Sequence, residues 1–188
     1  MAAKPELIEE FKKCFPAVAK ELGPKNLEVL VGATTALELP AGRKIIRDRM
    51  PVDSLYMVLE GKLTISVEEN RKAIRLGHAG PGQLLGEVSV LSGELLASST
   101  VESETPVRLL RLRHEKFGEL IATNYEIANA MLRQLVNMLA DRLRTSSRSF
   151  SELTTHDAGP AHAAGPDDGP STRGHNWLKS FFDRVPGT

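Results

Sequence analysis

Short runs of alternating or β-branched residues, separated by glycine, proline or aspartate, fill the sequence between Thr34 and Arg113. The runs are Thr34–Leu39, Arg43–Arg47, Ser54–Leu59, Lys62–Val67, Lys72–His78, Ala97–Glu102 and Val107–Arg113. Many short strands with turn residues at this spacing are typical of antiparallel sandwiches and jelly rolls. Glycine in Pro40-Ala41-Gly42 and Glu60-Gly61-Lys62 suits tight reversals, because it adopts positive φ without steric cost. The region therefore predicts a mainly β domain.

Helical periodicity flanks this region on both sides. Apolar residues recur at helical spacing from Leu7 to Leu22, which predicts an amphipathic helix that Gly23-Pro24 stops. A second short helix or turn is expected over Asn26–Val31. After Arg113 the period predicts a short helix around Phe117 and a long one that begins near Tyr125. The fold class is therefore mainly β with flanking helices.

The apolar face of the long helix is wider than one contact needs. We expect part of it to pack on the β domain and a second stripe to form a helix-to-helix homodimer. That stripe comprises Ala128, Leu132, Leu135, Leu139 and Leu143. In the alternative, the N-terminal helix of the same chain covers both faces.

Charge and cysteine content exclude several classes of function. Lys and Arg number 24 against 24 Asp and Glu, so the net charge is zero and gives no bulk attraction to nucleic acid. The single cysteine, Cys14, excludes an internal disulfide framework and a multi-cysteine metal site. The N-terminus lacks an apolar signal core, and no stretch approaches the roughly 20 apolar residues of a membrane span. We expect a cytoplasmic protein.

The strand pattern is interrupted between Gly80 and Leu96, where Gly86-Glu87 precedes about one helical turn. Backbone N–H groups in the first turn of a helix have no partner within the helix and can receive a phosphate. Glycine allows close approach to the backbone, and a carboxylate such as Glu87 can accept a hydrogen bond from a ribose hydroxyl. Helix capping alone would also explain the pair.

In order along the chain, four segments resemble the cyclic nucleotide-binding domain family, of the catabolite-activator and protein-kinase-A regulatory type. They are Pro40-Ala41-Gly42, Asp53–Leu63, Gly82 with Leu85–Leu91, and Leu110–Phe117. The resemblance covers about residues 24–145. It implies an eight-stranded antiparallel β-roll, a phosphate-binding cassette from Gly86 to Thr100, and a long C-terminal helix used for dimerisation and signalling.

The resemblance also implies a ligand site and exposes a departure from the family pattern. The implied ligand is a cyclic nucleotide, held by Gly86, Glu87, Val88, Ala97, Ser98 and Ser99, and no metal or other cofactor is expected. Ala97 stands where the family has the arginine that binds the cyclic phosphate, and no Arg or Lys occurs between Gly77 and Pro106. Losing that charge-assisted bond weakens binding roughly ten- to a few hundred-fold. Basic residues that could replace it from elsewhere are Arg75, Arg108 and Arg133.

Five segments are expected on this basis: an N-terminal helix (1–23), the β-roll (24–118), hinge and dimerisation helices (119–148), a flexible linker (149–175) and an amphipathic terminal segment (176–188). Thr145-Ser146-Ser147 is expected to weaken the long helix. In the terminal segment Trp177, Phe181 and Val185 fall on one helical face. They either dock on a protein partner or fold back over the pocket as a lid.

Together these features predict a non-catalytic regulatory or sensor protein. A metal-dependent jelly-roll enzyme is disfavoured because the histidines lack ligand spacing. Direct DNA binding is disfavoured because no helix-turn-helix follows the long helix. The remaining alternative is a ligand-free dimeric scaffold that captures a partner through its C-terminal tail.

Overall fold

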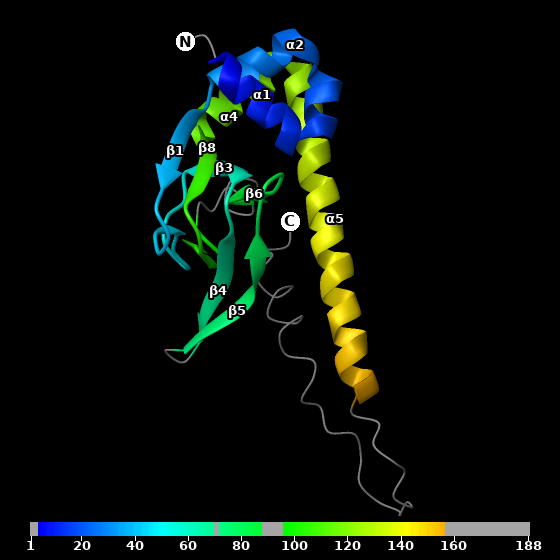
Figure 1. Cartoon of the computed structure of the whole chain (residues 1–188). Helices are drawn as coiled ribbons and strands as arrows, with labels where there is room; N and C mark the ends of the chain where they lie inside the picture. Colours follow the sequence, from blue (N-terminus) through cyan, green and yellow to red (C-terminus); the bar gives the residue numbers. More distant parts are fainter. Residues whose placement is uncertain (1–3, 70–71, 88–95, 157–188) are drawn as a thin grey trace, which may run out of the picture. The chain divides into compact units, whose positions relative to one another are not determined.

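The computed structural model describes residues 4–69, 72–87 and 96–156, with side chains described as far as residue 144 (Figure 1). Two compact units divide the chain, Met1–Ser147 and Arg148–Thr188. Everything below concerns the first unit, apart from the last turns of its final helix. Val88 of the predicted site, the predicted cassette helix and the Trp177 segment lie outside the described residues.

Eight strands in the described residues form two four-stranded antiparallel sheets. The first sheet has the order β1 (Thr35–Leu39), β8 (Val107–Arg113), β3 (Ser54–Glu60), β6 (Leu84–Leu85). The second has the order β2 (Lys44–Ile46), β7 (Thr100–Ser103), β4 (Leu63–Glu69), β5 (Lys72–Ala79). This arrangement confirms the predicted β-roll.

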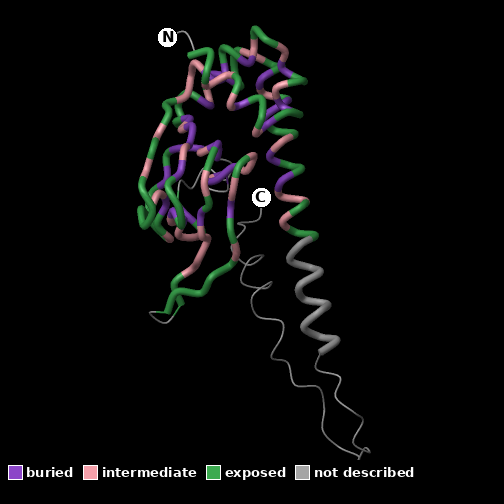
Figure 2. The backbone as a smooth tube through the Cα atoms, in the orientation of Figure 1, coloured by how far each residue is buried: buried purple, intermediate pink, exposed green. Residues whose placement is uncertain are grey.

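Strand periodicity explains how the first sheet supports two cores. Successive side chains of a strand point to opposite faces. On β3, Leu55, Met57 and Leu59 therefore join the core beneath the helices, whereas Val58 joins the core between the two sheets. Leu110 and Leu112 of β8 face the helices in the same way, and Leu109 faces the other sheet. Buried segments accordingly follow the middle of the roll and the helices above it (Figure 2).

The N-terminal region is two helices, α1 (Pro5–Cys14) and α2 (Pro16–Gly32), so the single helix expected up to Leu22 is wrong at Phe15. Phe15 has φ −124° and ψ 58°. A residue before proline is disfavoured in the helical region, and Pro16 suits the first position of the next helix. The expected stop at Gly23 is a kink inside α2, where φ is 66°.

Helices α4 (His114–Thr123) and α5 (Tyr125–His156) follow the last strand. The side-chain oxygen Oδ1 of Asn124 accepts a 3.0 Å hydrogen bond from the backbone N–H of Ile127, which caps the start of α5. The expected start near Tyr125 is confirmed. The helix then continues through Thr145–Ser147 to His156, so the first residues of the predicted linker are helical.

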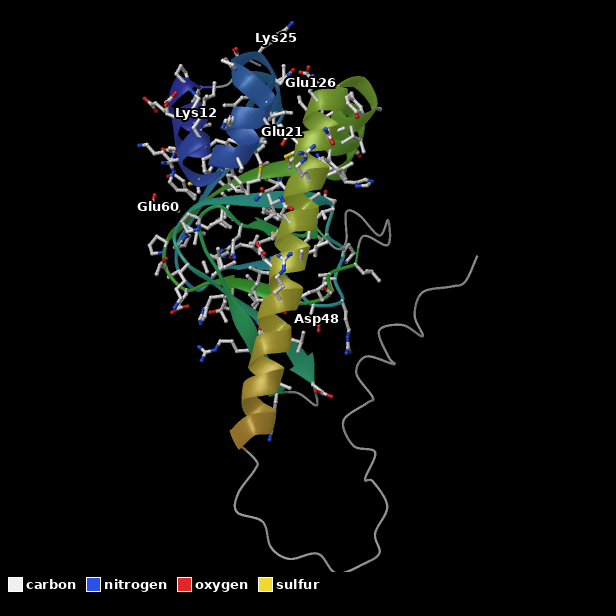
Figure 3. All side chains as sticks on the ribbon, turned by 90° about the vertical axis from the view of Figure 1, so that its right-hand side faces the viewer. Lys12, Glu21, Lys25, Asp48, Glu60 and Glu126 are labelled. Carbon is white, nitrogen blue, oxygen red and sulfur yellow. The ribbon has the colours of Figure 1, made fainter. Side chains whose placement is uncertain are left out.

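One face of α5 packs on the rest of the unit, as the two perpendicular views show (Figures 1 and 3). Ile127, Met131, Leu135 and Met138 are buried there. The predicted stripe needs a correction, because Leu135 belongs to this packed face and not to an exposed one. Among residues 126–144 of α5, whose side chains are described, the exposed large apolar ones are Leu132, Val136 and Leu143.

Among the described helices, none has both the length and the apolar composition of a membrane span.

Candidate functional site: the turn at Gly86 and Glu87

Gly86 directly follows β6 and has a conformation that favours glycine. Its φ is 80°, and a Cβ placed there would lie 2.5 Å from the carbonyl oxygen of Ser54 on β3. Both the backbone angle and the close neighbour exclude a larger residue. The turn after β6 is therefore pressed against β3. This close contact fixes the backbone position of the next residue, Glu87.

Glu87 is the first helical residue after this turn, and its side chain is only 4% exposed. A buried carboxylate is costly unless it is paired and hydrogen-bonded. The sequence predicts a helix start at this position, and the residues that would continue that helix lie outside the description. The Glu87 carboxylate is buried because a residue far along the chain covers it, which the sequence pattern did not indicate.

Arg142 of α5 covers Glu87. Its Nη1 donates to Oε1 of Glu87 in a short charge-assisted hydrogen bond, and its Nη2 donates to the carbonyl oxygen of Leu84 at 3.0 Å. The two groups form an ion pair in which the arginine side chain is 35% exposed. A guanidinium thus closes the site from the outside and holds α5 against β6.

Helical spacing explains why Arg142 reaches this point. Leu135, Met138 and Arg142 follow at intervals of three and four and share one face of α5. Leu135 is buried in the core beneath the helices, and Met138 Sδ accepts a 3.4 Å hydrogen bond from the backbone N–H of Leu84. One turn further along, the same face carries Arg142 over the residues that follow Leu84.

Ala97 lies inside the roll and not at an open surface. It is 6% exposed and packs in the same apolar cluster as Val52 and Leu85. Its backbone pairs with the turn that precedes β3. The N–H of Ala97 donates to the carbonyl oxygen of Met50, and its carbonyl oxygen accepts from the N–H of Arg49, each at 2.9 Å. The predicted strand over Ala97–Glu102 begins only at Thr100.

The remaining predicted ligand residues differ in exposure. Ser98 is exposed and Ser99 is half-buried. Val52 connects the two halves of the site, because it packs with Ala97 and its Cγ1 would lie 3.3 Å from a Cβ at Gly86. Gly86 and Ala97 are therefore anchored on the same segment before β3.

The three basic residues that the sequence offered as replacements for the missing arginine are engaged or exposed elsewhere. Arg108 pairs with Glu10 and Glu38, and Arg133 pairs with Glu21. Arg75 is exposed on β5. Sequence reasoning missed Arg142, although its spacing from Leu135 and Met138 was a usable signal.

The junction between α4 and α5 is tied to α2. Asn124 donates from Nδ2 to Asn26 Oδ1 at 3.0 Å, and Asn26 in turn donates to the carboxylate of Glu126. These contacts fix the position at which α5 leaves the rest of the unit.

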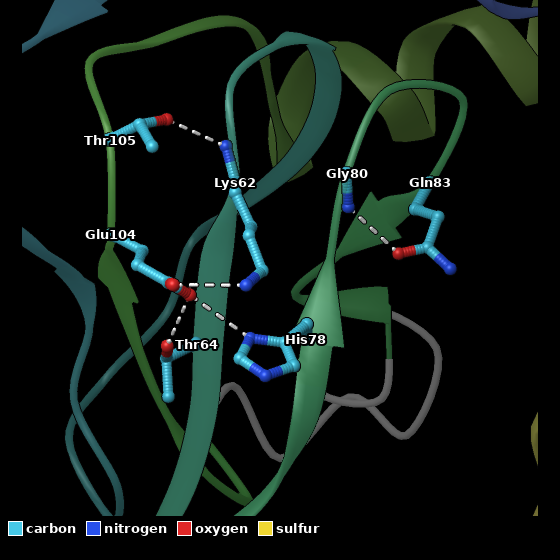
Figure 4. A network of polar contacts seen from close by, with 7 residues as sticks. All are labelled: Lys62, Thr64, His78, Gly80, Gln83, Glu104 and Thr105. Carbon is cyan, nitrogen blue, oxygen red and sulfur yellow. Dashed lines mark hydrogen bonds and ion pairs between the residues drawn. The ribbon is translucent and has the colours of Figure 1, made fainter.

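A second polar cluster is centred on Glu104 (Figure 4). Lys62 Nζ lies 2.9 Å from Glu104 Oε1, while His78 Nδ1 and Thr64 Oγ1 approach Oε2 at 3.1 and 3.3 Å. The hydrogen bond from Lys62 is the main cause that lowers the pKa of the Glu104 carboxyl. The cluster is exposed and joins strands β4, β5 and the turn after β7.

Two open hollows occur elsewhere in the described residues, and neither is lined by Glu87. One lies between α2 and α4, and the other lies beside β1, β3 and β8. Across residues 4–69, 72–87 and 96–156, no group of three or more His, Cys, Asp or Glu side chains could hold a metal ion.

Residues 36–124 match the sequence profile described as "Cyclic nucleotide-binding domain". Residues 36–124 therefore carry the sequence pattern of a cyclic nucleotide-binding domain. The match covers the β-roll from the second residue of β1 onward and includes Gly86, Glu87 and Ala97. It agrees with the resemblance carried by the turn and cassette motifs.

Two relatives in sequence are much longer than the region they share with this chain. A cyclic nucleotide-gated potassium channel of Mesorhizobium japonicum is 36% identical over 109 residues, 58% of this chain and 29% of the channel. "Glutaminase 2" of Bradyrhizobium diazoefficiens is 28% identical over 140 residues, 74% of this chain and 22% of that protein. The chain thus spans less than a third of either relative's length.

The cyclic nucleotide-binding domain also has a close structural counterpart. The catabolite activator protein of Thermus thermophilus superimposes with a TM-score of 0.61 at 25% identity, over 73% of this chain and 63% of that one. The similarity extends beyond the β-roll to part of the flanking helices, because the matched share exceeds residues 36–124.

Proposed function

We propose that this chain is a non-catalytic regulatory protein whose β-roll binds a cyclic nucleotide at the turn formed by Gly86 and Glu87. The observation that carries the proposal is the buried Glu87 carboxylate, directly after a glycine pressed against β3. A carboxylate there can accept a ribose hydroxyl, and the helix start can receive a phosphate. The absence of Arg or Lys from Gly77 to Pro106 makes binding weak.

Binding at this turn would be transmitted through α5. Arg142 and Met138 both contact the Leu84–Glu87 segment, so a ligand that enters beside Glu87 meets the helix directly. A ligand shifts such a contact only by binding its two arrangements with unequal affinity. The hinge at Asn124, tied to α2, is the point about which α5 would move.

Calorimetric titration of the full chain with cyclic AMP and cyclic GMP tests the proposal. The wild-type chain is expected to bind one of them, and Glu87→Gln should weaken that binding by about tenfold because it removes a charged acceptor. Glu115→Gln, an exposed carboxylate on α4, is the matched control and should leave the affinity unchanged. Absence of heat at high micromolar nucleotide would reject the proposal.

A homodimer through α5 is the assembly we propose. The exposed side chains Leu132, Val136 and Leu143, with half-buried Leu139 between them, follow the alternating four- and three-residue spacing of a coiled-coil seam. A seam of this kind favours a second copy of the same helix. Leu132 and Val136, in the middle of this helix, are 43% and 64% exposed in the first unit.

The second candidate function is a dimeric scaffold that binds no nucleotide. Ala97 packed into the apolar core and Glu87 closed by Arg142 favour it, because both reduce what a ligand can reach. Partner capture by Trp177, Phe181 and Val185 remains a prediction for residues outside the description. Deleting residues 177–188 should then abolish capture of a purified partner without lowering the melting temperature, whereas a large fall in melting temperature would indicate a folded-back lid.

A further inference from the structure

A cyclic nucleotide brings one negative charge to a site that already holds a buried carboxylate. The charge of Glu87 therefore opposes the ligand unless a cation stands nearby. The segment that forms the turn and the cassette supplies none, since no Arg or Lys occurs between Gly77 and Pro106. A cation for the phosphate has to come from another element of the fold.

In the described part of the chain, the cation bonded to the turn at Glu87 is Arg142. It contacts Glu87 and the Leu84 carbonyl at once, so its guanidinium is fixed at the edge of the turn. A guanidinium has five N–H donors, and these two bonds use two of them. Its side chain is 35% exposed, which leaves it accessible from solvent.

We propose that Arg142 is the residue that binds the phosphate of the ligand, in place of the arginine that the cassette lacks at position 97. This inference rests on the proposed function and adds to it the source of the positive charge. Arg142 donates to the phosphate oxygens while Glu87 accepts the ribose hydroxyl. The bond described uses Oε1 of Glu87, and a carboxylate has a second oxygen for that hydroxyl.

The placement of this cation on α5 changes how the site works. A phosphate arginine inside the cassette would contact the ligand without belonging to α5. Here the ligand and the helix share one side chain, so filling the site and positioning α5 are a single event. Leu135 and Met138 hold the same face of the helix against the core and limit how far Arg142 can retreat.

Arg142→Gln tests the inference, with Arg144→Gln as the matched control. Arg144 lies two residues away on the same helix, is 69% exposed and pairs with Asp141. By calorimetry on the full chain, Arg142→Gln should weaken cyclic nucleotide binding by about tenfold or more, while Arg144→Gln should leave it unchanged. Arg142→Lys keeps the charge but loses the planar pair of donors, so its affinity should fall between wild type and Gln.

A phosphorus-31 NMR measurement separates contact with the phosphate from mere support of the fold. At saturating cyclic nucleotide, the chemical shift of the bound phosphate should differ between wild type and Arg142→Gln and should be the same in Arg144→Gln. Weaker binding with an unchanged shift would overturn the inference and make Arg142 a positioning residue. Unchanged or tighter binding by Arg142→Gln would overturn it too and show that the arginine blocks the site.

The proposed function and this inference fail in different ways. If neither wild type nor any variant binds cyclic nucleotide, both are rejected. If wild type binds and Glu87→Gln weakens binding while Arg142→Gln does not, the proposed function stands and the role of Arg142 is rejected.

Discussion

Ala97 is a small residue in a place where the surrounding core leaves little room. Its side chain packs with Val52 and Leu85 in the cluster between the two sheets and is 6% exposed. The Ala97 side chain is therefore part of the hydrophobic core between the two sheets. An arginine there would need space and a partner for its charge.

Ala97→Arg is expected to lower the free energy of unfolding by about 1 to 3 kcal/mol, because extra atoms in a packed core force neighbouring side chains and backbone to shift. Ser98→Arg is the control, since that side chain is exposed and a surface substitution changes stability by about 0.5 kcal/mol at most. Urea denaturation measures both. If Ala97→Arg kept wild-type stability, the site would hold a cavity large enough for the side chain.

Glu104 gives the second prediction at this scale. The hydrogen bond from Lys62, with contributions from His78 and Thr64, lowers the pKa of its carboxyl in the folded state. A lowered folded pKa stabilises the fold above the ordinary carboxyl pKa, and this contribution is lost as pH falls through the folded value. Glu104→Gln should therefore flatten the fall of the melting temperature below about pH 4.5, the usual range of such groups.

The change in the pH dependence of the melting temperature should be small, because the Lys62–Glu104 pair is exposed and screened by solvent. Added salt screens the Lys62–Glu104 pair, so it should reduce the contribution of this pair to the acid slope of wild type. Glu104→Gln lacks the pair and has no such contribution to lose. A melting curve series from pH 7 to pH 3 checks the slope. An identical slope in both proteins would show that Glu104 adds nothing to acid stability.

Residue identity alone could predict Glu87 but not its partner. A glycine followed by a carboxylate at a helix start is a local pattern, so the sequence contains it in full. Arg142 is separated from Glu87 by 55 residues, and its approach depends on how α5 packs against β6. The sequence marks the apolar face of that helix but not the strand that it contacts.

At the scale of elements, long periodic segments could be predicted and short irregular ones could not. The strands of the roll and the start of α5 follow clear periods. Strand β6 has two residues, too few for an alternation to be recognised. The break at Phe15 was missed because the apolar period continues across Pro16, although proline disfavours a helical residue before it.

Asn124 carries the prediction for the α4–α5 junction. Its side chain caps α5 through Ile127 and also contacts Asn26 on α2, so Asn124→Ala should destabilise the fold by about 1 kcal/mol or slightly more. Asn129→Ala, at an exposed interior position of α5, should be neutral or slightly stabilising because alanine favours helices. Chemical denaturation measures both variants. Equal stability of the two would contradict the cap.

For the whole molecule, the proposed dimer would form through the exposed apolar face of α5. Val136→Glu places a charge in the exposed apolar seam and should convert the expected dimer to a monomer. Asn137→Glu, on an exposed polar face of the same helix, should leave the dimer intact. Light scattering after gel filtration measures the mass. A monomeric wild type would reject the dimer, and a dimeric Val136→Glu would move the interface elsewhere.

Arg142 and Leu143 are consecutive residues on α5, and they point about 100° apart around its axis. The first reaches the Leu84–Glu87 turn, and the second belongs to the exposed seam. If a second copy packs on the seam, a rotation of α5 that alters this packing would also move Arg142. By reciprocity, the apparent affinity for a small ligand would then vary with protein concentration, and self-association would vary with ligand by the same factor.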